Sequence, residues 1–269
     1  MQPCRARYWV AVDLTAVAGN LSQSFRVIAA ARAGGAVCEL PGVSIASAGV
    51  AFQMFNAAFL SQPVESAEQL ERRVVQAGVY FGAHGQEWAY WVCEGLMDAR
   101  TRRTARRHFE RHGLRHSVDL PGMVSDSLQP PARPLPAMDI QRVTGEPLRT
   151  AFCGISSVCF HVPLPWLLEV YDNEAVFRDF ACYVGFVDGE PVSTAAVVQG
   201  GGALGVYNVA TLPAHRRRGC GEAVMRHALE EAAHQHGTRR VVLQSTPLGL
   251  RLYARMGFRQ VTTVAVYAS

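Results

Sequence analysis

Three arginines and two glycines lie close together in the segment Val206–Glu222, which reads VYNVATLPAHRRRGCGE. We expect a strand that ends near Ala210, a short loop, and a helix that opens at Gly219-Cys220-Gly221. A helix N-terminus has unpaired N–H groups and a partial positive charge, and glycine lets a ligand approach the backbone closely. Arginine side chains add cationic donors that suit phosphate oxygens. The segment therefore predicts a binding site for a pyrophosphate group.

A second segment with a distinctive pattern lies near the end of the chain. Leu252–Phe258 reads LYARMGF, a short helical pattern that ends at Gly257. On the residues alone, Tyr253 could simply pack where the helix meets the next strand.

Together the two segments resemble the GNAT superfamily of acetyl-CoA-dependent N-acetyltransferases. The phosphate loop of that family has the pattern Q/R-x-x-G-x-G/A, which Arg216, Gly219 and Gly221 match. The Leu252–Phe258 segment is similar to the family ending L-Y-x-x-x-G-F, and the interval between the two motifs also fits. The resemblance covers residues 138–269. It implies a mixed α/β sheet with a splayed central pair of strands, flanked by helices.

The resemblance also implies a role for each matching residue. The backbone of a strand would pair with the pantetheine arm of acetyl-CoA, at Val209, Ala210 and Thr211. Backbone N–H groups and arginine side chains would hold the pyrophosphate, at Arg216, Arg217, Arg218, Gly219, Cys220, Gly221 and Glu222. Tyr253 would be the general acid that protonates the leaving thiolate, a role that suits a phenol with a pKa near 10 because the departing thiolate has similar basicity. A primary amine would attack the thioester directly, with acetyl-CoA as cosubstrate and no metal.

Two positions depart from the family pattern, and they leave the general base open. Many family members carry a glutamate on the strand before the phosphate loop, but Leu204–Thr211 contains no carboxylate. Many also carry asparagine seven residues before the tyrosine, where this chain has Thr246. The base could be a water held by the backbone, or a side chain such as Glu169 or Asp172. An amine that is already neutral when it binds has less need of a general base.

The elements that must position these residues follow one another in an α/β order. We expect the strands Cys182–Val187, Val192–Val198, Leu204–Val209, Val241–Gln244 and Phe258–Tyr267, with turns at Asp188-Gly189 and Gly200–Gly202. The helices expected are one around Pro165–Tyr171, then Glu222–His236 and Leu250–Met256. The glycines at 200, 202 and 205 formally spell a dinucleotide loop, but they precede a strand, which favours a hairpin.

A proline-rich stretch divides the chain, and the first part reads as a separate α/β domain. We expect domains at residues 1–126 and 138–269, joined by a linker at residues 127–137. In the first part we expect helices at Ser22–Ala33, Ala67–Ala77 and Thr101–His112, and strands at Val43–Ala48, Trp88–Val92 and Ser117–Met123. Our hypothesis is a degenerate acetyltransferase-like domain that shapes the substrate cleft. The alternative is an unrelated α+β accessory domain.

Composition excludes several kinds of chemistry. All 26 basic residues among the 269 are arginine, so Schiff-base catalysis, a Walker A loop and a protein-kinase site are excluded. The seven cysteines are an odd number and no pair has C-x-x-C spacing, which indicates a reducing compartment. No apolar run is long enough to cross a membrane, and the N-terminal stretch Tyr8–Ala18 lacks a signal-peptide layout. We therefore expect a cytoplasmic protein.

Three further features have a structural and a functional interpretation. His108, His112 and His116 are spaced by four, but Gly113 interrupts the helix and arginines surround them, so we expect no metal. The arginines of Arg100–Arg115 are typical of a solvated helix face, which is favoured over the alternative of a nucleic-acid-binding accessory protein whose binding would depend steeply on salt. Cys220 could be reactive at a helix N-terminus, although a small residue in a tight turn is the favoured interpretation.

The sequence thus predicts an N-acetyltransferase that acts on the amine of a small molecule or peptide. The alternative is a non-catalytic acyl-CoA sensor or regulatory module, which the missing strand carboxylate would favour. The identity of the acceptor amine and the oligomeric state have no signal in the sequence.

Overall fold

One mixed sheet runs through both halves of the chain. The structure, a computed structural model, describes the backbone of residues 3–269 and the side chains of residues 11–269. Its sheet has 11 strands in the order β1-β2-β3-β4-β11-β5-β10-β9-β8-β7-β6. The first half contains α1 (Pro3–Ala30), β1 (Ala36–Leu40), β2 (Val43–Ser47), β3 (Asn56–Leu60), α2 (Ala67–Ala83), β4 (Ala89–Cys93), α3 (Ala99–Arg111) and β5 (Arg115–Ser125).

The second half contains β6 (Asp139–Arg142), α4 (Glu146–Phe160), α5 (Leu164–Val170), α6 (Val176–Asp179), β7 (Ala181–Val187), β8 (Glu190–Gly200), β9 (Ala203–Thr211), α7 (Cys220–His236), β10 (Val241–Gln244), α8 (Leu250–Arg255) and β11 (Arg259–Ala268). The mixed sheet flanked by helices is the fold class that the sequence predicts. Every strand and helix predicted for the second half is present, with ends shifted by a few residues.

The two halves exchange strands at the middle of the sheet. β5 belongs to the first half, yet it pairs antiparallel with β10 on one side and with β11 on the other. β11 in turn pairs antiparallel with β4 of the first half, from Val264–Cys93 to Ala268–Ala89. Each half therefore completes its part of the sheet with a strand from the other half. The backbone hydrogen bonds of β4 and β10 thus depend on strands that the other half supplies.

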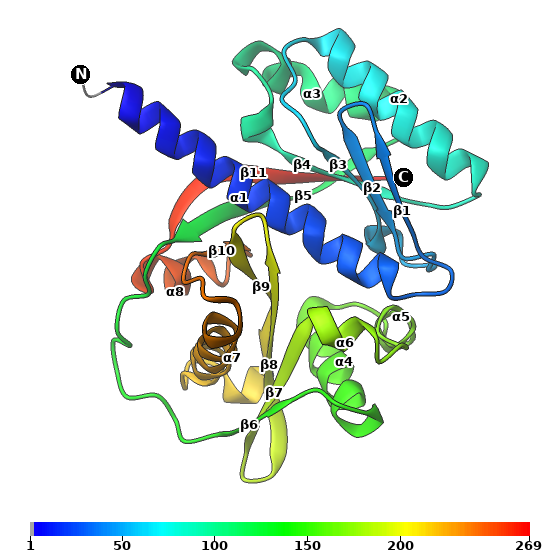
Figure 1. The fold of residues 1–269 in the computed structure, drawn as a ribbon. Coiled ribbons are helices and arrows are strands. Elements are labelled where there is room, and N and C mark those ends of the chain that lie inside the picture. Colours follow the sequence, from blue (N-terminus) through cyan, green and yellow to red (C-terminus); the bar gives the residue numbers. More distant parts are fainter. Residues whose placement is uncertain (1–2) are drawn as a thin grey trace.

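Helices cover both faces of this sheet (Figure 1). On one face α2 and α3 pack over the first half, and α7 and α8 pack over the second. On the other face α1 crosses the sheet beside both halves, and α4, α5 and α6 cover β7, β8 and β9. A loop of the first half, through Ala48 and Val50, joins the core under α4 and α5.

The helix α1 begins much earlier than the predicted Ser22–Ala33, and buried polar residues attach it to the sheet. Asn20 is fully buried, and its amide donates hydrogen bonds to the carbonyl oxygens of Val198, Gly200 and Ala203 at 3.1, 2.9 and 3.1 Å. Its own oxygen accepts from the Tyr207 hydroxyl at 2.7 Å. A side chain at Gly205 would start 1.7 Å from that oxygen, so glycine is required where the helix meets the strand.

A buried carboxylate forms a second attachment of α1. Asp13 is 1% exposed and forms ion pairs with Arg240 and Arg259, the latter at 2.6 Å. Arg240 also pairs with Asp126, at 2.9 Å, where the linker begins. A buried charge needs such partners, because leaving it unpaired is strongly destabilising. This network joins α1 to Arg240, directly before β10, and to Arg259, the first residue of β11.

The two hairpins of the second half have the turn geometry that the sequence predicts. Asp188 and Gly189 both have positive φ, at 52° and 81°, and so do Gly201 and Gly202, at 58° and 74°. Two successive positive φ values define the type I′ turn, whose twist matches that of the flanking strands. The glycines at 200, 202 and 205 therefore belong to a hairpin, as predicted, and not to a dinucleotide loop.

The same order of elements occurs in both halves. In the first half β2 and β3 are antiparallel, β3 is parallel to β4 through the crossover helix α2, and α3 leads to β5. In the second half β8 and β9 are antiparallel, β9 is parallel to β10 through α7, and α8 leads to β11. Over the part of the chain that the structure describes, no helix is both long enough and apolar enough to cross a membrane.

Candidate functional site

An open strand edge lies at the centre of the second half. The parallel pairing of β9 with β10 extends only from Leu204–Val241 to Val206–Leu243. β9 then continues to Thr211, whereas β10 ends at Gln244. The two strands therefore separate, and five residues of β9, from Tyr207 to Thr211, continue past the end of that pairing. This is the splayed pair that the sequence predicts, and it exposes backbone groups to a ligand of extended shape.

A bulge in β9 accompanies the separation. Between the pairs Thr194–Ala210 and Ala196–Tyr207, β9 has two residues where β8 has one. One of the two is Asn208, whose φ is 50°, and its carbonyl accepts a hydrogen bond from the Thr194 hydroxyl at 2.7 Å. A bulge bends its strand and increases the local twist, which turns the end of β9 away from β10.

The phosphate loop follows directly after the open edge. Arg217 has φ 62° and Gly219 has φ 93°, immediately before α7 begins at Cys220. Alternation of left-handed with ordinary residues makes successive N–H groups point into one concavity, which is an anion-binding arrangement. Arg217 and Arg218 are exposed, and the Arg216 guanidinium donates to the Thr211 carbonyl at 3.0 Å. The loop thus combines backbone donors, a helix N-terminus and cationic side chains.

Gly221 holds the loop close to the open edge. A Cβ atom at this position would lie 3.0 Å from the Thr211 hydroxyl oxygen and 3.6 Å from a methyl group of Val209. The Thr211 hydroxyl is itself fixed by the Ser193 hydroxyl at 2.9 Å. The glycine therefore serves close packing of α7 on β9. A side chain at this position would point toward β9. Glycine is therefore needed here for packing, whereas the sequence had suggested that it lets a phosphate approach the backbone.

Cys220 and Glu222, the other two residues predicted from α7, are both engaged with the protein. Cys220 is 2% exposed, and burial raises the pKa of its thiol, which opposes a reactive thiolate. Both observations favour its interpretation as a small residue in a tight turn. Glu222 pairs with Arg226 one turn later, at 2.8 Å, so its charge does not stand alone at the helix N-terminus.

Tyr253 lies on α8, beside the same two strands. It belongs to the core cluster that includes Val206, Leu243 and Val209. The side chain is 8% exposed, and burial raises the pKa of its phenol to about 12. Its ring lies edge-on to Phe258 with centroids 5.8 Å apart, and Gly249 leaves room for the ring on another side. The phenol therefore carries its proton throughout the physiological pH range.

Comparison with known proteins agrees with this geometry. Residues 178–260 match the model of the acetyltransferase (GNAT) domain. The chain carries a GNAT acetyltransferase domain. The protein is thereby an acyltransferase, and the matched residues include the open edge, the phosphate loop and Tyr253. No curated protein sequence matches the chain significantly.

Solved structures share the fold over most of the chain. A GCN5-related N-acetyltransferase from Kribbella flavida has a TM-score of 0.69 at 17% identity, covering 93% of this chain and 94% of that one. A functionally unknown conserved protein from Staphylococcus epidermidis has a TM-score of 0.63 at 11% identity, with coverages of 87% and 94%. A tandem GNAT protein from the clavulanic acid biosynthesis pathway has a TM-score of 0.54 at 14% identity, with coverages of 89% and 84%. At these identities the likeness concerns the fold.

The two carboxylates considered as a general base have different surroundings. Asp172 pairs at 2.7 Å with Arg32, two residues after the end of α1, so its charge is already matched by a guanidinium. Glu169 lies at the end of α5, and its backbone carbonyl accepts a hydrogen bond from the same arginine.

The three histidines spaced by four do not lie together. His108 and His112 both lie near Glu71 of α2, whereas His116 lies on β5 beside Asp119.

No group of three or more His, Cys, Asp or Glu that could hold a metal occurs within the described residues. The six described cysteines are free, and Cys4 lies outside the residues whose side chains the structure describes.

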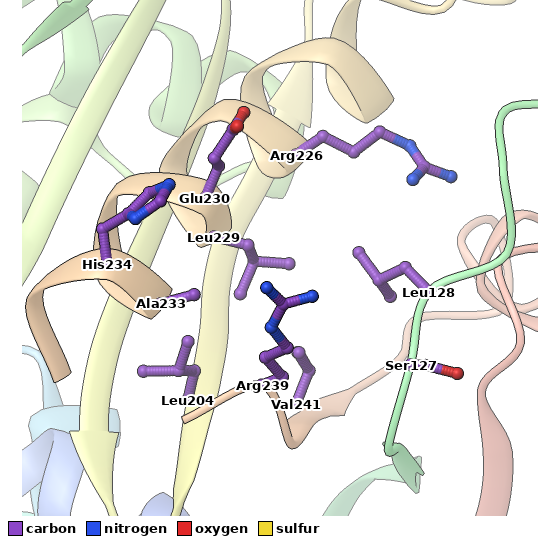
Figure 2. Close-up of a pocket in the computed structure, with 10 residues that line it drawn as sticks. All are labelled: Ser127, Leu128, Leu204, Arg226, Leu229, Glu230, Ala233, His234, Arg239 and Val241. Carbon is purple, nitrogen blue, oxygen red and sulfur yellow. The ribbon is translucent and has the colours of Figure 1, made fainter. Parts of the chain in front are cut away.

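One hollow of the structure lies apart from the open edge. It has a volume of about 460 Å³ and lies between α7, the start of β10 and the beginning of the linker (Figure 2). Leu204, Leu229 and Val241 form its apolar floor, and Leu128 of the linker faces them. Sequence reasoning predicted neither this hollow nor the contact of the linker with α7, because both depend on where an irregular segment runs in space.

Proposed function

We propose that the second half of the chain transfers the acetyl group of acetyl-CoA to a primary amine by direct attack. The pantetheine arm would add to the open edge of β9 at Val209, Ala210 and Thr211. The pyrophosphate would lie in the loop from Arg216 to Glu222. One observation carries the proposal: the open edge and the phosphate loop are consecutive, and Gly221 packs against Thr211 where they join. An extended ligand with a phosphate end matches that arrangement.

In this proposal Tyr253 is the general acid. When the amine attacks the thioester carbon, a C–N bond forms and the C–S bond breaks, and the sulfur leaves as a thiolate that needs a proton. A buried phenol that is protonated at physiological pH supplies one beside the strands that would hold the pantetheine. The amine loses its proton to water or to another base, and a carboxylate on β9 is not needed if the amine arrives neutral.

The test is a screen of acceptor amines with acetyl-CoA. Free thiol released from acetyl-CoA is measured over antibiotics, polyamines, amino acids and peptides with free N-termini. Thiol release that depends on both an amine and the enzyme supports acetyl transfer. Tight binding of acetyl-CoA with no amine-dependent release would instead favour the alternative, a non-catalytic acyl-CoA sensor, which the lack of a carboxylate on Leu204–Thr211 favours.

We further propose that residues 1–126 form a degenerate domain of the same fold, which supports the sheet but binds no CoA. The repeated order of elements supports a common fold. At the end of α3 the chain repeats the geometry of α8: Leu114 N donates to Phe109 O at 3.1 Å, as Phe258 N donates to Tyr253 O at 3.0 Å. Phe109 thus holds the position of Tyr253, without a hydroxyl group.

The first half also differs from the second at the two places that would bind CoA. β3 ends at Leu60, one residue after its last pair with β4, so it has no long open edge. The N-terminus of α2 is capped by the Ser66 side chain, and Glu68 occupies its first turn, which disfavours an anion. Calorimetry is expected to give one CoA per chain; a stoichiometry of two would contradict the proposal.

A further inference from the structure

The proline-rich linker lies against the phosphate loop. The Arg133 guanidinium donates a hydrogen bond to the carbonyl oxygen of Arg217. A Cβ atom at Gly219 would lie 3.1 Å from a ring carbon of Pro136 and 3.7 Å from a methyl group of Leu135. A connection that merely spanned two domains would need none of these contacts. The linker therefore forms part of the surroundings of the phosphate loop.

Contacts further along the linker fix its course. Arg226 of α7 donates to the carbonyl oxygen of Gln129 at 2.6 Å, and Gln129 N donates to the carbonyl oxygen of Met256 at 2.9 Å. Figure 2 shows Arg226 extending from α7 toward the linker side of the hollow. Prolines at 130, 131, 134 and 136 stiffen the segment between these contacts and the loop. Arg133 is thus held in place before any ligand arrives.

The charge of Arg133 is available at the loop. The side chain is exposed, and one N–H of its guanidinium is used by the Arg217 carbonyl. A guanidinium has five N–H donors in a planar fork that matches phosphate oxygens. The acid closest in sequence to the loop, Glu222, is already paired with Arg226 at 2.8 Å. Glu222 therefore does not neutralise the positive charge of the loop arginines.

We propose that Arg133 of the linker is a ligand of the phosphate groups of CoA, so that the linker supplies one wall of the cosubstrate site. This inference rests on the proposed function, because it requires that CoA occupies the loop. It adds a residue from outside residues 138–269, the region to which the family resemblance extends. CoA has two kinds of phosphate, the pyrophosphate and the 3′-phosphate on the ribose, and both are targets for a guanidinium.

Calorimetric titration of the full-length protein tests the proposal. The titrants are CoA and dephospho-CoA, which lacks the 3′-phosphate, and the proteins are the wild type, Arg133→Ala, Arg133→Lys and Arg103→Ala. Arg103 is an exposed residue of α3 and serves as the control for loss of one positive charge. We expect Arg133→Ala to weaken CoA binding about tenfold, equivalent to about 1.4 kcal/mol. We expect Arg133→Lys to recover part of the loss and Arg103→Ala to bind as the wild type does.

The pattern across the two titrants identifies the phosphate. A loss confined to CoA assigns Arg133 to the 3′-phosphate, and an equal loss for both titrants assigns it to the pyrophosphate; either supports the proposal. Equal affinity of Arg133→Ala and wild type for both titrants would overturn it, even though CoA still binds. If the wild type itself does not bind CoA, the proposed function fails first. Thermal unfolding of each variant shows whether a loss of binding reflects a loss of fold.

Discussion

The substitution Tyr253→Phe tests the proposed chemistry by removing one oxygen atom. The ring remains, with its edge-on contact to Phe258 and its fit against Gly249, so the packing of α8 should be unchanged. Binding of acetyl-CoA depends in our proposal on β9 and the phosphate loop, and Tyr253 belongs to neither. We therefore expect a change in kcat with little change in the affinity for acetyl-CoA.

The size of the effect follows from the environment of the phenol. General acid catalysis contributes about 10²- to 10⁴-fold, and its efficiency depends on the acid's pKa. Burial raises the pKa of Tyr253 to about 12, whereas an ordinary thiol has a pKa of about 8.5. Proton donation is then uphill in the unliganded site, which places the contribution in the lower part of that range. We expect kcat to fall by about 10²- to 10³-fold, or about 2.7–4 kcal/mol in activation free energy.

The assay measures thiol release under single-turnover and steady-state conditions, with the binding constant for acetyl-CoA determined separately. The raised pKa also predicts that the wild-type kcat does not fall between about pH 9 and pH 10.5, where an ordinary tyrosine begins to ionise. An unchanged kcat in Tyr253→Phe would remove Tyr253 as the acid. A fall in kcat matched by an equal loss of acetyl-CoA affinity would show that the tyrosine acts in binding instead.

Three other substitutions examine the scaffold. Gly221→Glu should abolish CoA binding, because a long charged side chain that starts 3.0 Å from the Thr211 hydroxyl would force α7 and β9 apart. Gly221→Ala adds the Cβ atom alone and is the milder control, and normal affinity in the Glu variant would remove Gly221 from the site. Asn20→Ala removes two amide N–H donors, which three carbonyl oxygens share, and the oxygen that accepts from the Tyr207 hydroxyl. At about 1 kcal/mol for each of these three hydrogens, chemical denaturation should show a loss of about 3 kcal/mol; less than about 1 kcal/mol would contradict the role of Asn20. Burial, followed by the charge of Asp119, raises the pKa of Glu94, so its stabilising contribution is full at low pH and is lost as pH rises through the raised pKa. Glu94→Gln should therefore raise Tm at pH 7 but not near pH 4, and an equal shift at both would refute this.

Much of the second half could be predicted because its signals are local. The phosphate loop, the Asp188-Gly189 turn and the helix stop at Gly237 each depend on a few neighbouring residues with special backbone angles. Short irregular elements were harder. The strands β1, β3 and β6 have four or five residues and were not expected, and the early part of α1 was not expected because Asp13 interrupts its apolar pattern.

The site could be predicted only where residues close in sequence form it. Arg216 to Gly221 are contiguous, so their role could be read from spacing. Arg133 comes to the same loop from more than eighty positions earlier, and no pattern in the sequence records that approach. The same holds for β5, whose place between β10 and β11 is set by strand pairing across the whole chain.

The exchange of β5 and β11 has a consequence for how the chain is made. β4 and β5 leave the ribosome well before Arg259–Ala268, the strand that lies between them in the finished sheet. Until that strand arrives, both have an edge with unpaired backbone groups, and such edges are prone to pair with other chains. Translation must therefore pass Arg259–Ala268 before either half can close its sheet. A truncated product that lacks β11 would lose the finished form of the first half as well as the second.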